Sequence, residues 1–459
     1  MQEKQRSWLE HVDVAKLFLP MLGLVASALS YAGLMEPWLS AVWITAMSLI
    51  LVVYLRKNRL LLFISLVIAY ACYSICYVNY FNPLSTTMYT SLSGTASAQT
   101  ALSSLLLFLS VLLIFSPKKI NEFGYRASIF SAKRGNTLVV AVISVALIFI
   151  LVYAFGRPDS IGSDRGSPSP LYEYSIILFL VGFYCAGDKK SLKGILIVLI
   201  FMFAGQNLLY GGRVTALQLL MVFFFIFLSP RMTIRSILPL LSIVFALFVT
   251  VGNMRTGILG ADIVDVFESV QDIFSRGFAW DTAYSSWHTS ITFLMYGGMI
   301  DASEHLRLFG QWLLSVFLGG SVPGSGLAVI TKSYFAHYYG GILPIFFQFY
   351  LGPFGVIAVA GCVAAIINWM NRTCGGIRSG DGSQVVYGMS VICTLYVTTT
   401  VFRWFLYSPA QITRGLILCA LVSLIALWVD GQMAKSSVFA RRTVSAKASS
   451  LEKNSDQFT

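Results

Sequence analysis

Four arginines stand at the ends of long apolar segments in this chain. Arg213 follows two glycines, Arg255 follows an apolar run, and Arg403 and Arg414 bracket the turn RWFLYSPAQITRG. A guanidinium group keeps its charge and presents a planar fork of N–H donors that matches a phosphate. Arg213 is also expected to open a helix, where free N–H groups and the positive dipole end favour anions. These residues predict a diphosphate-binding site; the competing explanation is that each arginine only marks a membrane interface.

The longest polar segment, residues 255–341, contains candidates for a general base. Asp281 lies outside the acidic face of a neighbouring predicted helix, and His337 lies close to the end of the segment. Removing a proton from a hydroxyl group requires a carboxylate or an imidazole within hydrogen-bond reach. We therefore predict that the base is Asp281 or a histidine of this segment, which also contains His288 and His305, with His337 as the first choice.

Aromatic residues are the candidate contacts for sugars, because ring faces stack on sugar rings. The predicted sugar-binding residues are Trp280, Tyr338 and Tyr350. Trp and Tyr also form belts at membrane interfaces, which is the competing explanation for most aromatic residues of the long segment.

The elements that must position these groups are membrane helices. The chain is 57% hydrophobic and 11% charged, whereas a soluble protein carries roughly a quarter charged residues. Apolar runs of about 17–22 residues recur, which is the length of helix that crosses a bilayer. The sequence predicts an all-α polytopic membrane protein with about twelve spans, near 17–35, 38–55, 60–79, 100–116, 137–155, 172–187, 194–210, 214–229, 236–254, 342–370, 385–402 and 409–429.

The positive-inside rule sets the predicted orientation. With both termini in the cytoplasm, 23 of the 32 Lys and Arg residues lie inside and nine lie outside. The net charge of +12 therefore reflects topology and contact with anionic lipids, with no nucleic-acid partner. The predicted units are a cytoplasmic N-terminus (1–14), nine spans (15–254), a large periplasmic loop (255–341), three spans (342–429) and a basic cytoplasmic tail (430–459).

The large loop is expected to contain helices of its own. Residues 262–276 alternate apolar and acidic positions with a helical period, which predicts an amphipathic helix. Residues 283–299 and 308–319 are apolar but short, and are expected to be interfacial or re-entrant; if both spanned, the total would be fourteen.

Several cofactor motifs are absent from the sequence. It has no Asp-x-Asp pair, no Walker loop, no dinucleotide fingerprint and no His-Glu-x-x-His. We therefore expect neither a metal nor a cofactor. The seven cysteines lie in apolar segments or a predicted cytoplasmic loop, which does not suggest a disulfide framework.

Two features, the hairpin turn Gly211-Gly212-Arg213 and the large external segment 255–341 between late spans, carry a resemblance to a known family. The chain resembles the Wzy-type O-antigen polymerases, which join oligosaccharide repeat units of bacterial surface polysaccharides, and more distantly the O-antigen ligases. Polymerases of this type often have a Gly-Gly-Arg or Gly-Ser-Arg turn in a membrane hairpin.

The exit from the large segment, HYYGGILPIFFQFYLGPFGVIAV, adds to this resemblance. Tyr350, Phe354 and Gly355 match the Tyr and the Phe-Gly step that the family often shows. Gln348 stands where the family often has an acidic residue, so this chain departs from the pattern there.

The resemblance implies a glycosyltransferase of the bacterial inner membrane with its active site facing the periplasm. The donor would be a growing glycan on polyprenyl diphosphate, and the acceptor a lipid-diphosphate-linked repeat unit that attacks through a sugar hydroxyl. Arginines that hold the diphosphate charge would make it a good leaving group without a metal. The partners would be these lipid-linked oligosaccharides, membrane lipids and a chain-length regulator protein.

Three other functions remain open at this level. An O-antigen ligase would use the same donor with a lipid A-core acceptor, and His337 fits that chemistry. A C-type glycosyltransferase would use polyprenyl-phosphate sugars and an external acid such as Glu36. A non-enzymatic flippase for lipid-linked glycans is the alternative from another class.

Overall fold

Polar capping residues set the starts of several helices in this chain. Asn58 accepts hydrogen bonds from the N–H groups of Leu60 and Leu61, and Asn136 accepts them from Leu138 and Val139. Such a side chain satisfies N–H donors that the first turn of a helix leaves unpaired. A polar residue before an apolar run therefore fixes where these helices begin.

The computed structural model contains helices joined by turns and irregular segments, with no strands among the residues that it describes. It describes residues 18–82, 92–121, 130, 135–156, 169–210, 212–232, 239, 271, 281–319, 322–337, 340–376 and 384–455. The labelled helices are α2 (Pro37–Leu55), α3 (Arg59–Cys76), α4 (Ala96–Phe115), α5 (Thr137–Tyr153), α6 (Pro170–Glu173), α7 (Ser175–Ala186), α8 (Lys190–Leu209), α9 (Arg213–Phe223), α12 (Asp281–Gly297), α13 (Ala302–Leu318), α14 (Leu327–Thr331), α15 (Leu343–Gly376), α16 (Gln384–Thr399), α17 (Val401–Leu406) and α18 (Ala410–Ser455).

Long apolar helices identify a membrane protein. Within the described ranges, six helices are long and apolar enough to cross a bilayer, and five more apolar helices are shorter, among them Phe18–Tyr31 before α2. These eleven helices coincide with eleven of the twelve predicted spans. The twelfth, residues 236–254, lies outside the described residues, as do the N-terminal segment 1–14 and nearly all of the amphipathic segment 262–276. The total of about twelve spans therefore stays a prediction.

One end of the bundle gathers cations. Asn58 donates to the carbonyl of Asn121 at 3.3 Å, and the Asn121 N–H donates to Asn371 at 2.8 Å. Asn136 donates to Asp430 at 2.9 Å, which joins the start of α5 to α18. We call this the basic end; its described cations are Arg56, Lys57, Arg59, Lys118, Lys119, Lys189, Lys190, Lys193 and Arg372.

The opposite end, which we call the loop end, holds the other helix termini. Gln99 at the start of α4 donates to the carbonyl of Met35 at 3.0 Å, and Gln206 near the end of α8 donates to Leu151 at 3.2 Å. Successive helices thus run in alternating directions. The described cations of this end are Arg213, Arg307, Lys332, Arg403 and Arg414.

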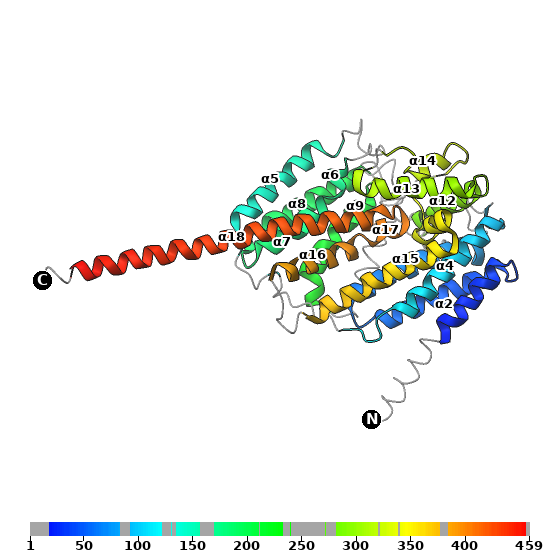
Figure 1. The fold of residues 1–459 in the computed structure, drawn as a ribbon, viewed down its shortest axis with the longest axis horizontal. Helices are drawn as coiled ribbons and strands as arrows, with labels where there is room; N and C mark the ends of the chain where they lie inside the picture. Colours follow the sequence, from blue (N-terminus) through cyan, green and yellow to red (C-terminus); the bar gives the residue numbers. More distant parts are fainter. Residues whose placement is uncertain are drawn as a thin grey trace, which may run out of the picture.

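Helix α12 lies inside the bundle. It packs against α3, α4 and α15, and Ala283, Trp287 and Ile291 belong to the main hydrophobic core. An interfacial helix would keep one face open, so the buried position of residues 283–299 does not fit an interfacial helix. The re-entrant and spanning alternatives stay predictions. Figure 1 places α12, α13 and α14 at the end of the bundle opposite the projecting part of α18.

A second, smaller core lies under α13. It is rich in aromatic residues and joins the end of α12 to α13, α14 and the start of α15. The opposite face of α13 is exposed and apolar, with Leu306, Leu313 and Phe317 one to two turns apart. An apolar helix that buries one face in protein and exposes another apolar face fits the interfacial position predicted for 308–319. The buried members of this core are Phe293, Tyr296, Leu308, Trp312, Val316, Leu327, Phe346, Phe349 and Tyr350.

The C-terminal segment continues α18. The tail predicted to begin at residue 430 stays helical to Ser455 and projects well beyond the bundle on the side away from α13 (Figure 1).

Ser303 allows a direct test of orientation. It is exposed at the start of α13, and the positive-inside count places it outside the cell membrane. Ser303→Cys in a cysteine-free variant is expected to react with a membrane-impermeant maleimide in spheroplasts. Lys57→Cys, at the basic end, is the matched control and should react only after permeabilisation. Protection of the cysteine at position 303 would reverse the topology.

Candidate functional site

Arg403 lies at the centre of a polar cluster at the loop end. Its Nη1 donates to Oε1 of Glu173 at 2.5 Å, and its Nη2 donates to Oγ1 of Thr215 at 2.7 Å. The side chain of Arg403 is 12% exposed and that of Glu173 is 26% exposed, so this ion pair is largely shielded from water. Three segments far apart in the sequence, α6, α9 and α17, meet at this guanidinium.

The hairpin before α9 is held in place by backbone and side-chain hydrogen bonds. The Gly212 N–H donates to the carbonyl of Asn207 at 2.7 Å, which closes the turn. Asn207 in turn donates to the hydroxyl of Tyr172 at 2.7 Å, and Tyr172 donates to Gln206 at 2.9 Å. The turn that precedes Arg213 is therefore anchored to α6, the helix that also carries Glu173.

Arg213 opens α9, as the sequence predicts. It is the first helical residue after Gly212 and is half-buried. Thr215 lies two residues further on and accepts the hydrogen bond from Arg403. Arg403 therefore contacts the first turn of α9, the helix that begins at Arg213. Gly211 of the predicted turn lies outside the described residues.

Arg414 joins the same cluster from α18. Arg414, Glu173 and Arg403 all lie within electrostatic range of Tyr174, the residue between α6 and α7. Nε and Nη2 of Arg414 donate elsewhere, to the carbonyls of Val316 and Ser315 in α13.

The turn between α17 and α18 does not form the capping box that the spacing of Ser408 and Gln411 indicates. Ser408 donates its N–H to the carbonyl of Arg403 at 3.0 Å, and its own carbonyl accepts from the Gln411 N–H. The Gln411 side chain contacts the hydroxyl of Tyr396 instead of closing the box. Tyr396 is buried and donates to the Gln411 carbonyl at 3.0 Å, so contact with α16 overrides the local pattern.

His337 is buried and lies against Thr331 and the ring of Phe293. Its Nε2 is 2.8 Å from Oγ1 of Thr331, and that hydroxyl donates to the carbonyl of Leu327 at 3.0 Å. In the tautomer with the proton on Nε2, His337 donates to Thr331. Nδ1 of His337 is then the nitrogen with a lone pair.

A second histidine, His288 on α12, faces the same region. Burial, and then the neighbouring charge of His337, lower the pKa of His288. Both effects favour the neutral imidazole of His288, and a neutral imidazole can accept a proton. The sequence places His288 among the histidines of the long segment but favours His337.

The two clusters meet at the turn after α17. The Gly341 N–H donates to the carbonyl of Leu406 at 3.0 Å, three residues after Arg403. Gly340 has φ +115° and its Cα is so close to Leu406 and Ser286 that a Cβ there would lie 3.1–3.2 Å from them. Glycine is required for this close approach. The segment that carries His337 is thereby fixed against α12 and α17.

The other predicted site residues divide into three groups. Arg255, Trp280 and Tyr338 lie outside the described residues. Asp281 begins α12, at the edge of what the structure describes, and its side chain is not among the described ones. Tyr350 is 4% exposed and packs beneath α13 in the second core.

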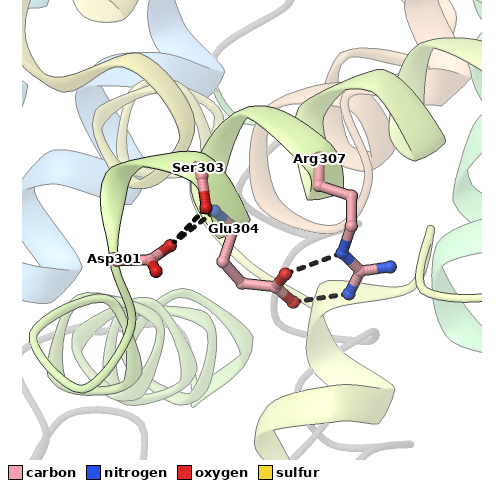
Figure 2. A network of polar contacts seen from close by, with 4 residues as sticks. All are labelled: Asp301, Ser303, Glu304 and Arg307. Atoms are coloured by element: carbon pink, nitrogen blue, oxygen red, sulfur yellow. Dashed lines mark hydrogen bonds and ion pairs between the residues drawn. The ribbon is translucent and has the colours of Figure 1, made fainter.

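Arg307 is an arginine of the loop end with a different environment. Its Nε and Nη2 donate to the two carboxylate oxygens of Glu304 at 2.6 and 2.5 Å, and Asp301 caps the same helix start (Figure 2). The Arg307 side chain is 55% exposed. The hydrogen bonds from Arg307 lower the pKa of Glu304, so the pair stays ionised and mutually neutralised. Exposed pairs of this kind contribute little to stability.

Glu173 and Tyr174 are the site residues that sequence reasoning missed. They lie in LYEY, at the start of a span after a connector rich in Gly, Ser and Pro. A carboxylate at a helix start beside the membrane was the available signal, because such a group needs a cationic partner.

Comparisons with protein-family models, with curated proteins and with solved structures gave no match.

Proposed function

We propose that the protein is a membrane glycosyltransferase that polymerises oligosaccharide repeat units carried on undecaprenyl diphosphate, at the periplasmic face of a bacterial inner membrane. The observation that supports this most directly is the meeting of Arg403 with the first turn of α9, which begins at Arg213. Two arginines and a helix N-terminus at one place form an environment suited to a diphosphate.

The proposed reaction uses these groups to stabilise the leaving diphosphate. The sugar C1–O bond to the donor diphosphate breaks while an acceptor hydroxyl forms a new bond to C1. Arg213 and Arg403 hold the negative charge that develops on the leaving group, which lowers the barrier without a metal. The proton of the attacking hydroxyl passes to a base, for which Nδ1 of His337 is the best-placed described nitrogen.

The position of His337 is one observation that favours the ligase alternative. His337 lies in a fixed segment at the exit of the long loop, and a ligase would use the same diphosphate donor with a lipid A-core acceptor. The flippase alternative is less well supported, because the arginines lie at one end of the bundle instead of along a central path.

A deletion strain separates these functions. Loss of a polymerase leaves lipid A-core carrying a single repeat unit. Loss of a ligase leaves long polymer on the lipid carrier with bare lipid A-core, and loss of a flippase leaves single lipid-linked units on the cytoplasmic side. Gel analysis of the lipopolysaccharide and of extracted lipid-linked glycans distinguishes the three. Any pattern other than the first would contradict the proposed function.

The base assignment predicts a defect in turnover. His337→Ala is expected to lower polymerisation about 10²–10⁴-fold, the usual contribution of a general base, with little change in donor binding. Asp281→Asn tests the other candidate in the same assay. Thr331→Val, which removes only the acceptor for Nε2–H of His337, should cost less. Near-normal polymerisation by both His337→Ala and Asp281→Asn would remove both residues from the mechanism.

Activity is expected to be independent of divalent metals. The sequence lacks an Asp-x-Asp pair, and arginines would supply the positive charge that a metal supplies in nucleotide-sugar enzymes. Purified protein in EDTA should still extend lipid-linked repeat units. Loss of activity that magnesium or manganese restores would contradict this.

A further inference from the structure

The side chain of Arg414 ends at the last turn of α13. Nε donates to the carbonyl of Val316 at 3.1 Å, and Nη2 donates to the carbonyl of Ser315. The final carbonyls of a helix lack partners in the next turn and form the negative end of its dipole. The guanidinium adds donors at this negative end, where the Ser315 carbonyl also accepts from the Gly319 N–H at 2.9 Å. Helix α18 thus caps a helix more than ninety residues earlier in the chain.

Helix α13 is held to the bundle by one face. Leu308, Trp312 and Val316 are buried in the second core, while Leu306 and Phe317 on the opposite face are exposed. The helix ends at Gly319, which has φ +92° and leads into a glycine-rich connection. Besides its apolar contacts, α13 forms described hydrogen bonds with its surroundings near both ends. His305 contacts the Gly297 carbonyl near the start, and Arg414 donates to the Val316 carbonyl at the end.

The face that α13 covers is aromatic. The ring centroid of Tyr350 lies 5.6 Å from that of Phe309 and 6.1 Å from that of Trp312. Tyr350 is therefore inaccessible to a sugar while α13 is docked. Movement of α13 away from α15 would expose Tyr350, Phe349 and Trp312, which are rings on which a sugar could stack.

We infer that Arg414 is a positioning residue that fastens the C-terminal end of α13 and keeps this helix closed over the aromatic face of α15. We further infer that Arg414 does not bind the diphosphate, a statement that rests on the proposed function. The contact between Arg414 and α13 is independent of that function. The assignment divides the loop-end arginines into two roles. Arg213 and Arg403 serve the diphosphate, and Arg414 controls access to Tyr350.

Hydrogen–deuterium exchange of the full chain in nanodiscs tests the fastening without reference to activity. Arg414→Ala should speed exchange of the α13 amides about tenfold or more, because charge-assisted hydrogen bonds to its last carbonyls are lost. Thr413→Ala, an exposed neighbour, is the matched control and should leave α13 unchanged. Arg213→Ala should also leave α13 unchanged.

Binding of undecaprenyl diphosphate to the same nanodiscs gives the second readout. Its Kd should be unchanged in Arg414→Ala and at least about tenfold weaker in Arg213→Ala, as for loss of a bidentate donor. Unchanged α13 exchange in Arg414→Ala would overturn the inference, and so would weakened binding in that variant. If none of the arginine variants alters Kd while α13 still loosens, the fastening stands and the proposed function fails.

A conservative variant guards against global unfolding. Faster exchange in α4, a core helix, would show that Arg414→Ala has lost the fold. The Arg414→Lys variant then replaces it in the experiment. Lysine retains a charged donor of similar length, so α13 should be more protected than in Arg414→Ala. In a Cys362→Ser background, which removes the exposed cysteine, Ser315→Cys at a buried position should resist maleimide when it is combined with Arg414→Lys. Rapid labelling of that combined variant would overturn the inference.

Discussion

Replacing Arg213 by alanine is expected to abolish polymer and leave single repeat units, with normal protein levels. Arg213 is the first residue of α9, and its helix start is anchored through Gly212 and Asn207 to Tyr172. A diphosphate there meets both a guanidinium fork and free N–H groups of a helix N-terminus. Removing one preorganised donor at developing negative charge costs about 10²–10³-fold in turnover, which is enough to leave undetectable polymer.

The lysine variant separates this role from a topological one. Arg213→Lys keeps the charge but loses the planar pair of donors, so polymer should remain strongly impaired. An arginine that only marks the interface would tolerate lysine, because snorkelling needs only charge and length. Arg307→Lys, in the exposed pair with Glu304, is the matched control and should retain normal polymer. Wild-type chain lengths in Arg213→Lys would remove the main support for the diphosphate site.

The apolar helices could be predicted because apolar length is a property that is local in sequence. A run of apolar residues of sufficient length forms a helix whatever its neighbours are, so eleven predicted spans coincide with apolar helices in the structure. Short or broken segments were less certain. Residues 283–299 are apolar with many Ser and Thr, and only their contacts with α3, α4 and α15 show that the helix lies inside the bundle.

The partners of the arginines could not be predicted in the same way. Glu173 and Arg403 are 230 residues apart, and their contact depends on the order and rotation of α6, α9 and α17 in the bundle. The length of an apolar run determines neither the order of these helices in the bundle nor their rotation. The sequence identified Arg403 and Arg414 as unusual cations beside a membrane, but not that one faces a carboxylate and the other faces helix carbonyls.

Arg307, Arg414 and Arg403, all at the loop end, therefore differ in what a ligand would have to displace. Arg307 is exposed and bidentate with Glu304, so an incoming diphosphate would compete with an intact ion pair in water. Arg414 holds the end of α13. Arg403 is shielded and binds Glu173 through a single nitrogen, which leaves further N–H groups of the same fork for an anion.

Arg403→Ala is expected to lower polymerisation about 10²–10³-fold, by the same loss of a preorganised donor. The variant also leaves Glu173 without its cation in a largely shielded position, where an uncompensated carboxylate repels a diphosphate. Glu173→Gln should behave in the opposite way. Its amide oxygen can still accept from Nη1 of Arg403, while the competing negative charge is gone, so the Kd for undecaprenyl diphosphate should stay equal or fall.

The double variant decides whether this ion pair serves the ligand or only the fold. If Arg403 binds the diphosphate and Glu173 holds it in place, Arg403→Ala with Glu173→Gln should bind undecaprenyl diphosphate more tightly than Arg403→Ala alone, because the repelling carboxylate is absent. Arg307→Ala is the matched control, since it breaks an exposed pair at the same end and should change Kd and melting temperature little. If the Arg403–Glu173 ion pair only stabilises the fold, the expected changes in melting temperature and Kd are different. Glu173→Gln and Arg403→Ala would then lower the melting temperature by similar amounts, with no change in Kd, and Arg403 would be removed from the proposed site.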